Sequence, residues 1–124
     1  ASEQWIQALN RIKPPYNLSG LVQEKAISVL RSTDWEQLKA SIVTEREKME
    51  TALKSLPLVL EIFPSEANFL LFRVENADKV YRELIQRDIV VRNRSTHYNC
   101  ENTLRVSIGN REENQRFIEI MNEL

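Results

Sequence analysis

Two arginine-bearing runs near the C-terminal end are the part of this chain best suited to chemistry. The runs are IVVRNRS at residues 89–95 and TLRVSIG at residues 103–109, and in each an arginine interrupts an apolar, β-branched stretch. Because side chains alternate along a strand, aliphatic residues of each run share one face and the arginines can take the other. We therefore expect Arg92 and Arg105 to point to a common side of a sheet.

An anion is the natural ligand for two guanidinium groups directed at one place. Arginine recognises phosphate or carboxylate through planar, bidentate hydrogen bonds, and an anion between two arginines removes their mutual repulsion. The other interpretation is that both side chains are solvated or paired with surface carboxylates, because long charged side chains usually stay exposed. The pattern alone leaves both interpretations open.

Other chemistries find little support in the sequence. Gly20 and Gly109 are the only glycines, so the chain holds neither a phosphate-binding P-loop, nor a dinucleotide-binding glycine motif, nor a G-x-S-x-G elbow. His97 and Cys100 are spaced like metal ligands, but no further ligands accompany them, and we predict no metal site. The sequence therefore indicates anion binding without visible catalytic groups.

Composition limits the class of protein and its partners. A chain of 124 residues with 42% hydrophobic and 28% charged residues is typical of one globular domain. The formal net charge of −1 favours neither a nucleic-acid nor a membrane partner. The single cysteine excludes an internal disulfide and fits a reducing compartment, so we predict a cytoplasmic location.

Hydrophobic periodicity predicts a mixture of helices and strands. Helices are expected at about 2–10, with Ser2 as a possible cap, from Ser19 to about 31, and at 34–55, where Glu45 interrupts the apolar stripe. The second half predicts strands at 58–63 and 68–74, a helix at about 77–87 capped by Asn76, the two arginine strands, and a last helix at 111–123 capped by Asn110. The chain opens inside a helix signal without an initiator methionine, which suggests a piece of a longer protein.

These elements predict a mixed α/β architecture of the α+β type. Residues from about 58 onward should form a small, mostly antiparallel sheet with helices packed on one face, preceded by connecting helices. The strand at 68–74 is apolar on both faces and should lie at the centre. We place the connecting helices and the PPYN segment in residues 1–33 and the small domain in residues 34–124.

Four segments, taken in order, resemble the C-terminal portion of the histidinol-phosphate aminotransferase family. They are IKPPYNLSGLVQ (12–23), SEANFLLFRV (65–74), DIVVRNRS (88–95) and TLRVSIGNREEN (103–114). The resemblance covers essentially the whole chain, and PPYN followed by VVRNRS and LRVSIG is more specific than any single motif. It implies the C-terminal domain of a fold-type-I enzyme that uses pyridoxal 5′-phosphate. Such an enzyme converts L-histidinol phosphate and 2-oxoglutarate to imidazole acetol phosphate and glutamate in histidine biosynthesis.

The resemblance also implies roles for individual residues. Arg105 matches the arginine that binds substrate carboxylates across the superfamily and meets the substrate phosphate in this branch, and Arg92 matches a second arginine of that site. Tyr16 matches a tyrosine that lines the substrate pocket, with a structural role behind the PP turn as the alternative. Asn17 and Asn68 fit turn or strand-end hydrogen bonds, and Arg94 is expected to face solvent or to pair with a carboxylate.

The family's cofactor lysine lies in a serine-lysine motif on the large domain, and no lysine of this chain sits in such a motif. The resemblance therefore implies a full-length homodimer that binds pyridoxal 5′-phosphate and small-molecule substrates, and a segment that alone binds no cofactor and is inactive. Two alternatives remain. The chain could be a stand-alone α+β module that senses a phosphorylated metabolite, or the small domain of a related aminotransferase or threonine-phosphate decarboxylase.

Overall fold

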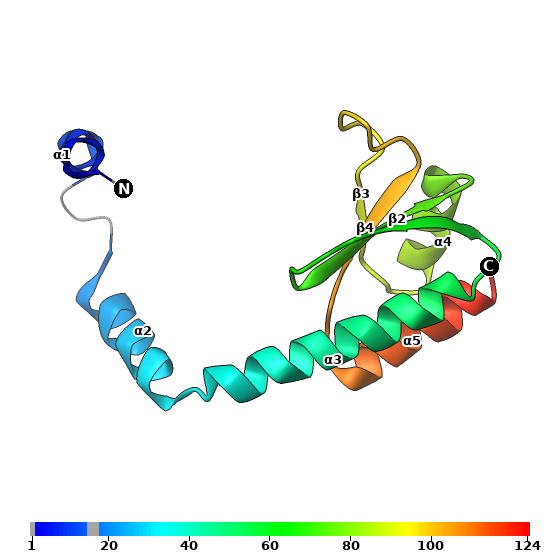
Figure 1. Cartoon of the computed structure of the whole chain (residues 1–124), viewed down its shortest axis with the longest axis horizontal. Helices are drawn as coiled ribbons and strands as arrows, with labels where there is room; N and C mark the ends of the chain where they lie inside the picture. The colour runs from blue at the N-terminus through cyan, green and yellow to red at the C-terminus, as the bar shows by residue number, and fades with distance from the viewer. Residues whose placement is uncertain (1, 15–17) are drawn as a thin grey trace. The chain divides into compact units, whose positions relative to one another are not determined.

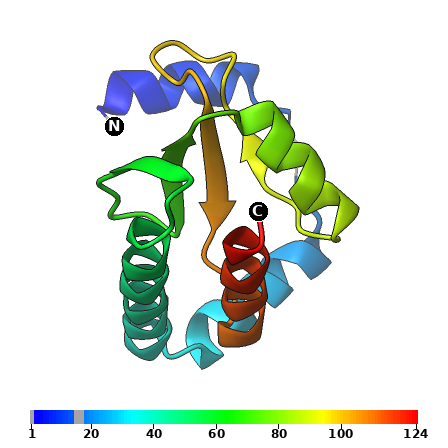
Figure 2. The same cartoon turned by 90° about the vertical axis from the view of Figure 1, so that its right-hand side faces the viewer.

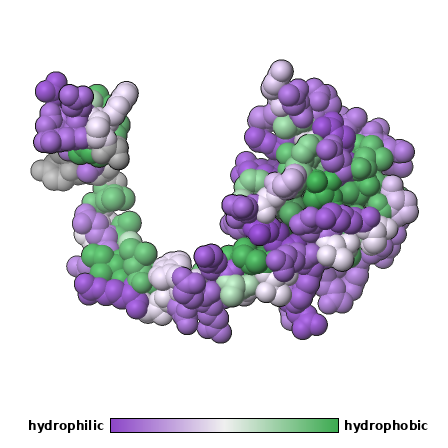
Figure 3. Space-filling model, viewed as in Figure 1, coloured by the Kyte–Doolittle hydropathy of each residue, from purple (hydrophilic) through white to green (hydrophobic). Residues whose placement is uncertain are grey.

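The computed structural model describes residues 2–14 and 18–124, and the chain divides into two compact units, Ala1–Trp35 and Glu36–Leu124. The first unit contains α1 (Glu3–Ile12) and α2 (Gly20–Ser32), and neither helix buries a residue. Ser19 caps α2 as predicted, since its side chain accepts a hydrogen bond from the Val22 N–H at 3.3 Å. Ser2 occupies the N-cap position of α1 as predicted, but its side chain makes no capping hydrogen bond. Apolar side chains of both helices lie on the surface (Figure 3).

The second unit is an antiparallel sheet with three helices (Figure 1). Its elements are α3 (Trp35–Lys54, which begins at the unit boundary), β1 (Val59–Phe63), β2 (Phe69–Val74), α4 (Ala77–Gln86), β3 (Arg92–Asn93), β4 (Thr103–Ser107) and α5 (Arg111–Asn122). The strand order is β1-β2-β4-β3, and every neighbouring pair is antiparallel. The predicted α+β fold class is therefore confirmed.

The core lies between one face of the sheet and the three helices (Figure 2). In β2, Leu70, Phe72 and Val74 are fully buried, and they alternate with half-buried residues on the opposite face. Their helical partners in the core come from all three helices: Met49 and Leu53 of α3, Ala77, Val80 and Leu84 of α4, and Phe117 and Met121 of α5. The central position predicted for β2 is confirmed. The opposite face of the sheet carries no core residues, and the candidate site is described on that face.

The first arginine strand is much shorter than predicted. Only Arg92 and Asn93 pair with β4, although the sequence indicated a strand over 89–95. The Ile89 N–H instead donates to the Leu84 carbonyl at 2.9 Å, just after Asp88 takes a left-handed φ of 61°. Val91 is 4% exposed and belongs to the core. The apolar run is thus explained by packing beneath the end of α4 and not by a long ladder.

The N-terminal caps predicted for the last two helices, α4 and α5, are confirmed. The Asn76 side chain accepts from the Lys79 N–H at 2.9 Å, and Asn110 with Glu113 forms a complete capping box for α5. Each satisfies a backbone donor that a helix start leaves open. Over residues 2–14 and 18–124, no helix is long and apolar enough to span a membrane.

Candidate anion-binding site

The pairing of the two C-terminal strands places Arg92 directly opposite Arg105. Opposite residues of an antiparallel pair have Cβ atoms about 4.5–5.5 Å apart and project to the same face. Leu104 and Val106, on either side of Arg105, are buried in the core, so Arg105 belongs to the face that the helices leave uncovered. The register therefore brings the two predicted site arginines together.

Neither of these arginines is neutralised within the part of the chain that the structure describes. Arg92 is exposed and Arg105 half-buried, and neither has an ion-pair partner there. The Nε of Arg105 is buried, and no acceptor for it lies among the residues that the structure describes. Like charges opposite each other destabilise a sheet, and a buried donor without an acceptor costs further free energy. A bound anion would remove the repulsion between the two guanidinium groups.

Arg73 lies on the same face but is already engaged. Its Nε is 3.3 Å from Glu61 Oε2, its Nη1 donates to the Glu101 carbonyl at 2.6 Å, and its Cζ lies 5.5 Å from the centre of the Phe63 ring. The cation of Arg73 is thus matched by a carboxylate across the β1–β2 pair. Among the described residues of the four strands, Arg92 and Arg105 are the arginines of this face without a carboxylate partner.

The remaining residues singled out from the sequence lie around or outside this pair. Tyr16 and Asn17 lie outside the described residues. The Asn68 carbonyl accepts from the Ile108 N–H at 2.8 Å, as expected for a strand-end residue. The Arg94 N–H donates to the Thr103 carbonyl at 2.9 Å, and its half-buried side chain has no ion-pair partner within residues 2–14 and 18–124. Its side chain is thus partly exposed to solvent, and a small contribution to substrate binding is a prediction.

The loop between β3 and β4 carries the histidine and the cysteine. His97 is exposed, Cys100 is half-buried, and the Cys100 N–H donates to the His97 carbonyl at 3.0 Å. Among the described residues, no three His, Cys, Asp or Glu side chains gather closely enough to hold a metal ion. The backbone hydrogen bond between the two residues forms part of the turn, and the lack of a metal site stays a prediction.

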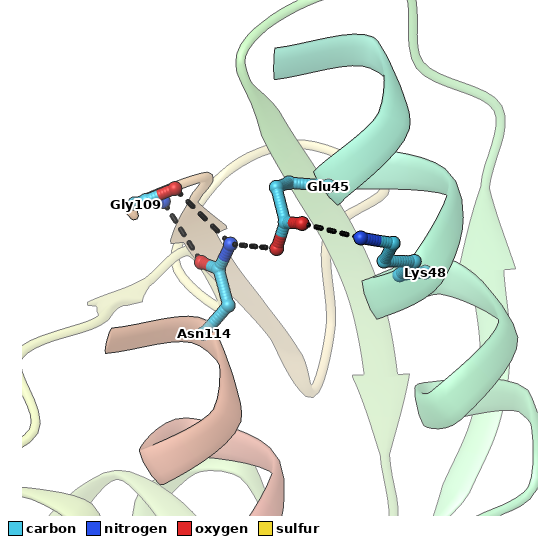
Figure 4. Close-up of polar contacts among 4 residues, drawn as sticks. All are labelled: Glu45, Lys48, Gly109 and Asn114. Atoms are coloured by element: carbon cyan, nitrogen blue, oxygen red, sulfur yellow. Dashed lines mark hydrogen bonds and ion pairs between the residues drawn. The ribbon is translucent and has the colours of Figure 1, made fainter. Parts of the chain in front are cut away.

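A polar network holds the chain at the C-terminal end of β4 (Figure 4). The sequence analysis did not predict this network. The buried Asn114 accepts from the Gly109 N–H at 2.9 Å, and its amide donates to the Gly109 carbonyl at 3.1 Å and to Glu45 Oε2 at 3.2 Å. Hydrogen bonds from Lys48 and then from Asn114 hold the pKa of the Glu45 carboxyl below its ordinary value of 4.5. In the sequence, Glu45 indicated such a network, because it interrupts the apolar stripe of α3.

The contacts around position 109 explain why this residue is a glycine. A Cβ atom there would clash with Glu113 Oε2 and lie 3.1 Å from Glu113 Cβ, and Glu113 is the residue that closes the α5 capping box. The network and the box thus hold the chain where β4 turns into α5. They fix the strand that carries Arg105 from its C-terminal end.

Comparison with solved structures defines the class of fold. The chain superposes on the histidinol-phosphate aminotransferase from Clostridium acetobutylicum with a TM-score of 0.89 and 24% identity, covering 98% of this chain and 38% of that one. It also superposes on the L-threonine-O-3-phosphate decarboxylase from Porphyromonas gingivalis with a TM-score of 0.76 and 20% identity, covering 99% and 39%. At these identities the match shows the fold, which is that of part of a fold-type-I enzyme.

Sequence comparison then gives the family. The model of the aminotransferase class I and II family matches residues 1–121, and the chain belongs to that family. It is 45% identical over 124 residues to the histidinol-phosphate aminotransferase of Flavobacterium psychrophilum, and 44% identical over 119 residues to that of Bacteroides fragilis. It covers 36% and 34% of those proteins, so it spans about a third of the length of these relatives.

Proposed function

We propose that this chain is the C-terminal part of a pyridoxal-phosphate-dependent histidinol-phosphate aminotransferase and supplies the arginines that bind the substrate anion. The single observation that carries the proposal is the pair Arg92 and Arg105, opposite each other and without carboxylate partners in the described residues. The relatives that match over nearly the whole chain bear the same name. The proposed reaction converts L-histidinol phosphate and 2-oxoglutarate to imidazole acetol phosphate and glutamate, within histidine biosynthesis.

The arginine pair suits both substrates of this reaction. In one half-reaction it would hold the phosphate of histidinol phosphate, with donors from both side chains. In the other it would hold a carboxylate of 2-oxoglutarate, for which the fork of Arg105 provides a bidentate match. One anion site then serves two substrates in turn. Tyr16, outside the described residues, is proposed to line the substrate pocket of the full-length enzyme.

The lysines of this chain do not fit the cofactor. All six are exposed, and Lys48 and Lys54 pair with Glu45 and Glu50 on α3. Pyridoxal 5′-phosphate supplies electron withdrawal in enzymes of this kind. We therefore propose that its attachment site lies in the part of the enzyme outside this chain, and that the segment alone is inactive.

The remaining assignments concern the whole enzyme. We propose that residues 1–33 connect the large and small domains, that residues 34–124 form the small domain, and that the full-length enzyme is a cytoplasmic homodimer. The exposed apolar side chains of α1 and α2, such as Trp5 at 68% exposure, support a connecting role because such surface is usually covered by other protein.

Kinetics of the full-length enzyme that carries this segment test the proposal. L-histidinol phosphate should be the preferred amino donor over aromatic amino acids, and L-threonine phosphate should not be decarboxylated. Preference for an aromatic amino acid would assign a related aminotransferase, and carbon dioxide release from threonine phosphate would assign a decarboxylase. Binding of phosphorylated metabolites without any turnover would favour the module that only senses them.

A further inference from the structure

We propose that Phe69 is a positioning residue that orients Arg105 for the anion without neutralising it. The proposal rests on the anion site described above and adds a residue to it. Arg105 Cζ lies 4.9 Å from the centre of the Phe69 ring, within the range of a cation–π contact. Phe69 itself was not among the residues singled out from the sequence.

The geometry of β2 holds the ring in place. Phe69 lies opposite Ser107, and Arg105 lies opposite Leu71, so the ring and the guanidinium are diagonal neighbours on the uncovered face. The Phe69 carbonyl accepts from the Ser65 hydroxyl at 2.7 Å, and the preceding Asn68 carbonyl accepts from Ile108. The strand is thus tied on both sides of its first residue, and the half-buried ring has a fixed base.

Arg73 shows the other way in which this face orients an arginine. Its guanidinium also lies over a ring, that of Phe63, but Glu61 and the Glu101 carbonyl take up its donors. A carboxylate that orients an arginine also cancels its charge and occupies its fork. The ring beside Arg105 contacts the guanidinium through π electrons and leaves the N–H donors available.

The buried Nε of Arg105 is consistent with an arginine that is held by a ring and not by a carboxylate. It has no acceptor among the described residues, although buried donors are almost always paired. Because the ring holds the guanidinium and no described carboxylate pairs with it, the side chain is preorganised for a ligand. The conformational cost of immobilising a long side chain is then met before the anion arrives.

The test uses the full-length enzyme that carries this segment. Phe69→Leu keeps an apolar side chain but removes the ring, and it should raise KM for both histidinol phosphate and 2-oxoglutarate by about 3–10-fold, with kcat changed less than about twofold. The inhibition constant of inorganic phosphate should rise in parallel. Phe69→Tyr, which keeps the ring face, should stay within about twofold of the wild type in all three quantities.

Phe63→Leu is the matched control, because it removes the same kind of contact from an arginine that keeps its carboxylate partner. It should leave KM and phosphate inhibition unchanged. Equal effects of Phe63→Leu and Phe69→Leu would overturn the proposal, as would a loss in Phe69→Tyr as large as in Phe69→Leu. Should Phe69→Leu also lower the melting temperature, the tyrosine variant decides the question.

Arg105→Ala separates this inference from the proposed function. If Phe69→Leu kept the wild-type KM and phosphate inhibition while Arg105→Ala raised both constants, the positioning role would be refuted. The anion site itself would not be contradicted. An Arg105→Ala enzyme with unchanged KM and phosphate inhibition would refute the anion site itself, and the positioning role with it.

Discussion

Replacing Arg105 by alanine in the full-length enzyme should weaken transition-state binding of histidinol phosphate by about 2–5 kcal/mol, or about 30- to 5,000-fold in kcat/KM. The structure sets this range. An exposed ion pair contributes only about 0–1 kcal/mol, but the Nε of Arg105 is buried and its guanidinium lies against Phe69. The substrate phosphate would thus lose a partly desolvated, hydrogen-bonded partner.

The conservative variant sharpens this prediction. Arg105→Lys should recover only part of the loss, because an ammonium group cannot reproduce the fork geometry of a guanidinium. The assay is kcat/KM for each half-reaction, measured with histidinol phosphate and with 2-oxoglutarate. The 2-oxoglutarate half-reaction should depend more on Arg105 than on Arg92, since a carboxylate needs fewer donors than a phosphate. Full activity of Arg105→Ala in both half-reactions would refute the reasoning.

Four further predictions concern the other arginines, the α3–α5 network and the chain by itself. Arg92→Ala should cost about 2–5 kcal/mol with histidinol phosphate, and Arg94→Ala only about 0–1 kcal/mol, both from kcat/KM; equal losses would contradict the assignment of the site. In urea denaturation of the 124-residue chain, Asn114→Ala should lower the free energy of unfolding by about 1–3 kcal/mol, because it leaves Gly109 unpaired; an unchanged midpoint would contradict this. Since the pKa of Glu45 is lowered on folding, its contribution to stability should be present above its ordinary pKa of 4.5 and be lost as the pH falls through the lower folded value. Glu45→Gln should remove this pH-dependent part of the free energy of unfolding. Identical pH profiles of the two chains would argue against this role of Glu45. The 124-residue chain should show neither transaminase turnover nor borohydride-trapped pyridoxal phosphate on a lysine, and should associate through apolar surface that includes Trp5; a stoichiometric adduct, or a clean monomer in light scattering at high concentration, would contradict these two expectations.

Strand alternation was enough to predict the arginine pair, because one face of the sheet is buried and the period of two then decides where every side chain points. The central position of β2 was predicted for a different reason, because its run is apolar on both faces. It overestimated β3, because an apolar run that packs beneath a helix end looks like a strand in the sequence. Here Val91 reaches the core without a ladder of hydrogen bonds around it.

The contacts that tune the site were beyond the sequence. The stacking of Phe69 on Arg105 depends on the register between β2 and β4, which brings together residues that are 36 positions apart (69 and 105). The bond from Asn114 to Glu45 joins α5 to α3 across an even longer separation. Glu45 did leave a trace, since a carboxylate within an apolar stripe needs a partner. The identity of that partner required the fold.

A comparison of substrates with and without the phosphate tests the central claim most directly. The full-length wild-type enzyme and an Arg92→Ala, Arg105→Ala double variant would each be assayed with L-histidinol phosphate and with L-histidinol. If the two arginines bind the phosphate, its removal should lower kcat/KM by about 100-fold or more in the wild type and by less than about tenfold in the double variant. The same ratio in both enzymes would contradict the claim, because the phosphate would then be recognised elsewhere.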